Sequence, residues 1–105
     1  MPPEAEVLLR ERETPEGLLV SVCDADCLGE TFAHEQGQLE VTEAFYGGAE
    51  AESAETDRIV ASLRRATTAN LVGDRAVGLA VEAGLVDENR VLELDGTRHA
   101  QLVRL

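Results

Sequence analysis

The sequence has no lysine and no tryptophan, only two cysteines and three prolines, and few aromatic side chains. Two cysteines are too few for the disulfide framework of a small secreted domain. The chain contains no apolar run of roughly 18 residues, which excludes a conventional transmembrane helix. The N-terminus lacks the basic and apolar regions of a secretory signal peptide. These absences predict a cytoplasmic protein.

The length of 105 residues fits one ordinary domain with one hydrophobic core. We therefore expect a single domain over residues 1–105, with a frayed tail at residues 1–5. The segment Gly73-Asp74-Arg75 lacks the glycine spacing and the lysine of a phosphate-binding loop. We accordingly predict no nucleotide and no other cofactor.

Acidic side chains dominate what is present. There are 21 acidic residues against 9 basic ones, all arginine, which gives a net charge of −12. Such a lysine-free acidic surface is expected of a halophilic protein in a cytosol at molar salt, and the alternative is an ordinary soluble acidic protein. The charge is uneven, because residues 1–57 carry a net −13 and residues 58–105 a net +1. This asymmetry predicts that one face meets a partner, unless buried helices alone account for it.

The stretch Ile59–Val86 is the most regular part of the sequence. Its apolar residues recur at helical spacing on both sides of Gly73. The pattern predicts two helices with a break near that glycine. Leu79 lies at the middle of the second apolar arc and is expected in the core.

Strand patterns occur at both ends of the chain. Val7–Arg12 and Leu18–Cys23 are separated by a proline–glycine turn and predict a hairpin. Arg90–Leu94 and Thr97–Leu105 flank Asp95-Gly96, the strongest hairpin signal in the sequence. We expect a compact α+β domain in which antiparallel strands pack on two central helices.

Side-chain alternation on the last strand has a further consequence. His99 and Gln101 share one face, whereas Arg98 and Arg104 share the other. A single binding surface can include the side chains of both faces only if this strand lies at the edge of the sheet. We therefore predict that Thr97–Leu105 is an edge strand with Arg98 exposed.

Four residues could in principle bind zinc, namely Cys23, Cys27, His34 and His99. Their spacing matches no standard finger or ribbon. Cys23 also lies in an apolar strand, where cysteine behaves as a small hydrophobe. We predict no metal site.

The arginines of the C-terminal half are candidates for phosphate contacts. The alternative is ordinary ion pairing with an acidic surface. The candidate RNA-binding residues are Arg64, Arg65, Arg75, Arg98, His99, Gln101 and Arg104.

A second set of polar residues could line a pocket. Asn70 lies within an apolar arc, and Tyr46 precedes two glycines whose N–H groups could hold an anion or support base stacking. The alternatives are a structural asparagine and a packed tyrosine. No acid stands beside His99 in the sequence, and no residue has a recognisable nucleophile context. The candidate pocket residues are Tyr46, Asn70, Asp74, Arg75 and His99.

Five segments of the sequence together match the pattern of a known family. They are Val22-Cys23-Asp24 through Leu28-Gly29, Phe45-Tyr46-Gly47-Gly48, the run from Ala66 to Ala76 (ATTANLVGDRA), the run from Glu82 to Asp87, and His99-Ala100-Gln101. On these residues the chain resembles an archaeal family known as domain of unknown function 424. The resemblance spans nearly the whole chain, and Cys27 departs from it, because an aliphatic residue is expected there.

The resemblance implies an archaeal cytosolic protein and no particular activity. It favours an association with translation. We therefore expect a non-catalytic RNA- or ribosome-associated binding module. The alternatives are a small cytosolic enzyme with the pocket described above and a protein–protein adaptor.

Overall fold

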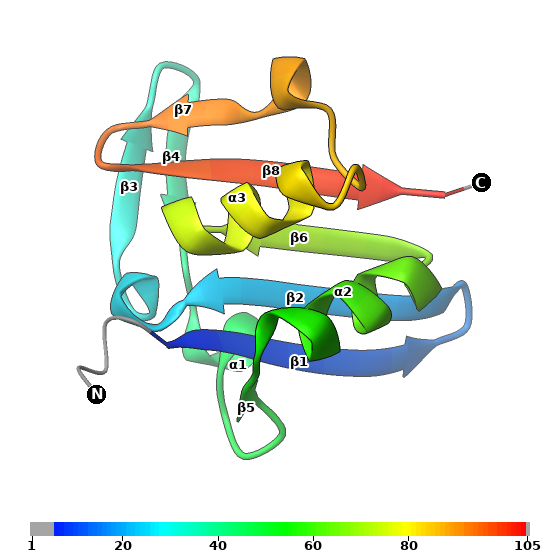
Figure 1. Ribbon diagram of the computed structural model, residues 1–105. Coiled ribbons are helices and arrows are strands. Elements are labelled where there is room, and N and C mark those ends of the chain that lie inside the picture. Colours follow the sequence, from blue (N-terminus) through cyan, green and yellow to red (C-terminus); the bar gives the residue numbers. More distant parts are fainter. Residues whose placement is uncertain (1–5, 105) are drawn as a thin grey trace.

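A six-stranded sheet forms the centre of the fold, which a computed structural model describes for residues 6–104. The frayed tail expected at residues 1–5 lies outside the described residues. Across the sheet the strands follow the order β5, β1, β2, β6, β8, β7 (Figure 1). Their bounds are β1 (Val7–Thr14), β2 (Gly17–Asp24), β5 (Glu52–Ser53), β6 (Thr68–Val72), β7 (Leu92–Leu94) and β8 (Thr97–Val103).

The two hairpins expected from the sequence are present. β1 pairs antiparallel with β2 across the turn between Thr14 and Gly17. β7 pairs antiparallel with β8 across Asp95-Gly96. Gly96 has φ +104°, a conformation that side-chain-bearing residues rarely adopt, which explains why glycine follows aspartate in this turn.

Strand β6 corrects the expectation for the central stretch. The first expected helix ends at Arg65, and Thr68–Val72 is a strand that pairs in parallel with β2 and antiparallel with β8. Ala69 and Leu71 are fully buried on one face of the sheet, and Val72 is fully buried on the other. A run that is apolar on both faces lacks strict alternation, so its pattern does not separate a strand from a helix.

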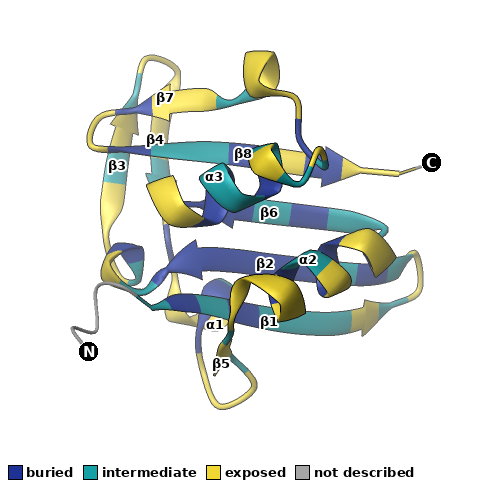
Figure 2. Ribbon diagram, in the orientation of Figure 1, coloured by how far each residue is buried: buried dark blue, intermediate teal, exposed yellow. Residues whose placement is uncertain are grey.

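Two helices, α2 (Thr56–Arg65) and α3 (Asp74–Glu82), cover one face of the sheet (Figure 1). The sheet, and not the helix pair, is therefore the central layer, and the parallel β2–β6 pair makes it mixed. The buried residues lie along the sheet and on the inner sides of both helices (Figure 2). The helices contribute Ile59, Leu63, Ala76, Val77 and Ala80 to this core.

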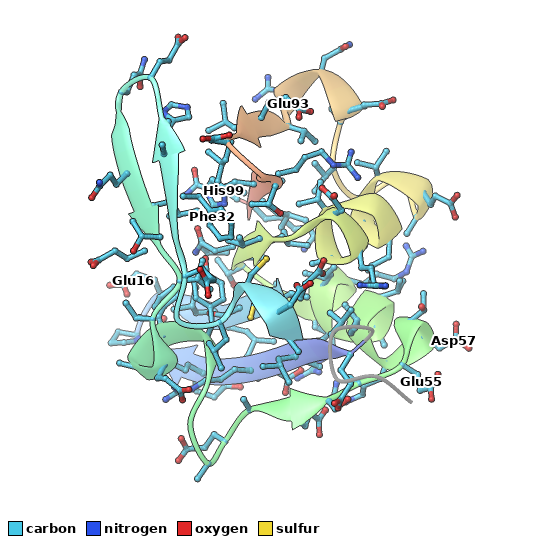
Figure 3. The ribbon with its side chains drawn as sticks, turned by 90° about the vertical axis from the view of Figure 1, so that its left-hand side faces the viewer. Glu16, Phe32, Glu55, Asp57, Glu93 and His99 are labelled. Carbon is cyan, nitrogen blue, oxygen red and sulfur yellow. The ribbon has the colours of Figure 1, made fainter. Side chains whose placement is uncertain are left out.

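The other face of the sheet carries a smaller apolar cluster. A hairpin of β3 (Thr31–His34) and β4 (Gly37–Glu40) and the single-turn helix α1 (Glu43–Tyr46) lie on this side (Figure 3). Thr42 caps α1, and its Oγ1 accepts a hydrogen bond from the N–H of Phe45 at 3.2 Å. The buried members of the cluster are Cys23, Cys27, Val41, Tyr46 and Val72.

The edge position predicted for the last strand is wrong. β8 lies between β6 and β7, and β7 pairs with its residues Thr97, Arg98 and His99. The connection from α3 contains a short 3-10 turn, η3 (Glu88–Arg90), after which the chain returns beside β8 as β7. The side chain of Arg98 is 27% exposed, so it is not the free edge cation that the sequence suggested.

Candidate functional site

The structure divides the candidate pocket between two faces of the sheet. Tyr46 is buried in the cluster on the α1 side, and Asn70 and His99 project from β6 and β8 on that same side. Asp74 and Arg75 begin α3 on the opposite face. These five residues therefore do not converge on one cavity.

The side chains of Asn70, His99 and Gln101 on the α1 side are held by hydrogen bonds within the protein. Nδ1 of His99 lies 2.9 Å from the carbonyl oxygen of Leu71. Nε2 of Gln101 donates to Oδ1 of Asn70 at 3.0 Å. Burial raises the pKa of the Tyr46 hydroxyl, so this group stays protonated at neutral pH. The arrangement contains no acid–base pair of the kind that general acid–base catalysis needs.

Most of the candidate RNA-binding arginines contact the protein itself. Nε of Arg98 lies 3.4 Å from Oδ1 of Asp74. Nη1 of Arg65 lies 3.0 Å from Oε2 of Glu11. Nη1 of Arg104 donates to the carbonyl groups of Leu63 and Ala66 at the end of α2, where a cation suits the helix dipole.

The remaining members of the RNA-binding set do not form one surface either. Arg64 is exposed and has no hydrogen bond or ion pair within residues 6–104. Arg75 acts electrostatically on the carboxylate of Asp24. His99 and Gln101 lie on the face opposite the arginines of α2 and α3, because β8 alternates and is enclosed by its neighbours.

The cysteines do not gather with the histidines. Within residues 6–104, the group of at least three potential metal-ligand atoms within 4.8 Å of one another consists of Asp24, Asp26 and Cys27. Burial raises the pKa of Cys23 to about 12 and that of Cys27 to about 11, so both are protonated thiols at neutral pH. The carboxylate of Asp24, moreover, already has partners.

Asp24 joins the end of β2 to the start of α3. It is 4% exposed, and its Oδ2 and Oδ1 accept hydrogen bonds from the N–H groups of Arg75 and Ala76 at 3.0 and 2.8 Å. Gly73, at the N-cap position of α3, has no side chain to do this. Asp24 therefore supplies the cap of α3 from a distant strand. It makes no side-chain capping hydrogen bond to the short turn η2 (Ala25–Cys27) that follows it in the sequence.

This contact predicts a pH dependence of stability. Burial raises the pKa of Asp24, and the hydrogen bonds from Arg75 and Ala76 oppose that shift only in part. The folded protein then holds a proton that the unfolded chain has lost, so this group's contribution to stability falls as pH rises above about 4. In urea melts between about pH 4 and 7, wild-type stability relative to Asp24→Asn should decrease with rising pH.

The difference in unfolding free energy between the wild type and Asp24→Asn isolates the contribution of Asp24. Glu11, whose pKa is lowered chiefly by a hydrogen bond from Ser62, contributes the opposite slope to both proteins and cancels. A relative stability that increases with pH would show that the cap hydrogen bonds outweigh the burial of the charge.

A groove of about 1200 Å³ lies beside α2 and α3. Its apolar lining includes the half-buried Val60, Leu79 and Val81. Three carboxylates line it without an ion pair or hydrogen bond within residues 6–104, namely Glu6, Glu55 and Glu82. Asp74, Arg75 and Arg98 line it as well.

Sequence reasoning missed this groove. Leu79 was expected in the core but is only half-buried, because the centre of α3 against the sheet is filled by Ala76, Val77 and Ala80. The available signal was that α3 is apolar around most of its circumference. A helix that is apolar all round is normally buried on all sides, whereas the sheet covers only the side of α3 that carries Ala76, Val77 and Ala80.

Comparison with known proteins agrees with the resemblance seen in the sequence. The model of a family described as "Protein of unknown function (DUF424)" matches residues 11–105. The crystal structure of an uncharacterized conserved protein from Methanopyrus kandleri is 31% identical, with a TM-score of 0.74 over 96% of each chain. No curated protein matches. Within residues 6–104, no helix is long and apolar enough to span a membrane.

The segments that carry the resemblance meet in space. Val22-Cys23-Asp24 ends β2, and the run from Ala66 to Ala76 contains β6 and the first turn of α3. They contact each other through the parallel pairing of β2 with β6 and through the cap from Asp24. These residues therefore have a structural role in joining β2, β6 and α3.

Proposed function

We propose that this chain, which belongs to the DUF424 family of proteins of unknown function, is a non-catalytic binding module that receives a segment of a partner protein in the groove beside α2 and α3. The groove is the observation on which this proposal rests. Its volume exceeds that of pockets for small molecules, which are about 300–1000 Å³. Its lining joins apolar side chains to charged ones, as surfaces that receive a protein segment do.

The enzyme alternative has less support. An active site built from the candidate pocket residues would need their titratable groups to converge in one cavity. Asp74 and Arg75 line the groove, whereas Tyr46, Asn70 and His99 lie on the other side of the sheet. A binding module needs no such convergence.

The hypothesis of an RNA- or ribosome-associated module competes with the adaptor hypothesis. Phosphate contacts need available cations, and Arg65, Arg98 and Arg104 are held by acidic or carbonyl partners within the protein. The net charge of −12 opposes binding to a polyanion. Both observations favour a protein partner.

Photo-cross-linking tests this proposal directly. We would place p-benzoylphenylalanine at Ala83, which lines the groove, or at Ala61, which is exposed on α2 outside the groove lining. After irradiation in native cell extract, we expect a discrete adduct from position 83 and none from position 61. The adduct should be destroyed by protease and resist ribonuclease.

Three results would overturn the proposal. A ribonuclease-sensitive adduct would support the RNA hypothesis, and Arg98→Gln with Arg104→Gln should then weaken RNA binding and flatten its salt dependence. An equal adduct from Ala61 would mean that the groove is not selective. The absence of any adduct at Ala83 would remove the groove as a binding site.

A further inference from the structure

We propose that the partner segment is a short cationic amphipathic helix, an inference that rests on the proposed function of the groove. The two helices beside the groove lie on the same face of the sheet (Figure 1). Such a surface suits the binding mode in which an amphipathic helix lays its apolar side into a hydrophobic groove.

The dimensions set the length of this segment. α3 lines the groove from Asp74 to Glu82, whereas α2 lines it only in its first turns, as far as Val60. α3 has 9 residues and is about 14 Å long, so a partner helix that follows it needs about three turns. Apolar residues at positions i, i+3, i+4 and i+7 then form a single stripe against the groove.

The apolar lining provides the surface that such a stripe would bury. Val60 comes from α2, and Leu79 and Val81 come from α3. All three are half-buried in the described protein. Further burial of this surface on binding is favourable, because each Å² of apolar area removed from water stabilises the complex by about 25 cal/mol.

The charges select a cationic partner. The carboxylates of Glu6, Glu55 and Glu82 line the groove without ion pairs or hydrogen bonds within residues 6–104, whereas Arg98 is already paired with Asp74. The groove therefore presents unpaired negative charge together with apolar surface. The net charge of −12 adds a long-range attraction for cations and a repulsion for anions.

Binding of a defined peptide tests this inference. The probe is a fluorescein-labelled, acetylated peptide of about 12 residues with leucine at the stripe positions and lysine elsewhere. By fluorescence anisotropy we expect saturable binding that is at least tenfold tighter than for the same peptide with glutamate in place of lysine. A shuffled Leu/Lys peptide without the stripe should bind more weakly than the amphipathic one.

Matched variants locate the contact. The pair Glu55→Gln and Glu82→Gln should weaken binding of the Leu/Lys peptide about three- to tenfold, as expected for two exposed ion pairs. The pair Glu16→Gln and Glu93→Gln changes the net charge equally outside the groove lining and should alter binding less than about twofold. Glu16, Glu55 and Glu93 are labelled in Figure 3.

The alternative results separate this inference from the proposed function. Equal binding of the Leu/Glu peptide, or equal losses in both variant pairs, would overturn the cationic-helix inference. If no peptide binds although Ala83 cross-links to a protein in extract, the inference fails and the proposed function stands. If Ala83 captures no protein, the proposed function fails.

Discussion

Replacing Gly73 with alanine should destabilise the protein by at least about 3 kcal/mol, because backbone strain and a steric clash act together. Gly73 has φ +117° and ψ 149°, a region almost confined to glycine. A Cβ built at this position would lie 2.3 Å from Cγ of Asp24, so the added methyl group occupies the place of the capping carboxylate. Urea unfolding followed by circular dichroism measures the loss.

A matched control separates the two causes. Gly84 has φ +76°, but a Cβ there meets nothing within 4 Å, so Gly84→Ala should cost only about 1–2 kcal/mol. All three atoms nearest to the added Cβ of Gly73→Ala belong to the side chain of Asp24. The double variant Asp24→Gly, Gly73→Ala should therefore lose less than the sum of the single variants. If the losses of the two single variants simply add in the double variant, the clash at position 73 does not depend on the Asp24 side chain.

Replacing Leu71 with alanine should cost about 2–5 kcal/mol. Leu71 is fully buried on β6, where the helices close over the sheet, so truncation leaves a cavity with little freedom to collapse. Leu79→Ala removes the same atoms from a half-buried residue and should cost only about 1 kcal/mol.

The two leucine variants should be compared by urea melts under one set of conditions. Equal losses would contradict the burial difference between β6 and the groove side of α3. Leu79→Ala should also weaken binding of the Leu/Lys peptide, whereas Leu71→Ala should act on stability alone. This contrast links the folding measurement to the proposed binding surface.

Local signals predicted the outer parts of the fold. The proline–glycine turn after Thr14 and the Asp95-Gly96 turn fix their hairpins through backbone conformations that few other residues adopt. Thr42 caps α1 through a bond to a residue three positions away. Such features depend on neighbouring residues only, and the sequence therefore reveals them.

The central strand and the candidate site depend on distant contacts. Thr68–Val72 is a strand because β2 and β8 are available on either side of it, and nothing in its own residues excludes a helix. Asp24 caps a helix that begins about 50 residues later in the chain, and no local pattern around Asp24 indicates this contact. The groove follows from where α2 and α3 lie on the sheet, which side-chain periodicity does not specify.

The parallel pairing of β2 with β6 also sets an order of events during synthesis. β1 can pair with β2 as soon as both have left the ribosome, but the other edge of β2 has no partner until β6 follows. The intervening residues, from Ala25 to Thr67, take several seconds to translate at about 5–20 residues per second. During that interval one edge of the apolar strand β2 stays unpaired. The nascent chain that carries it has a net charge of −13 over its first 57 residues. Mutual repulsion between such chains opposes their aggregation while the central strand is still being made.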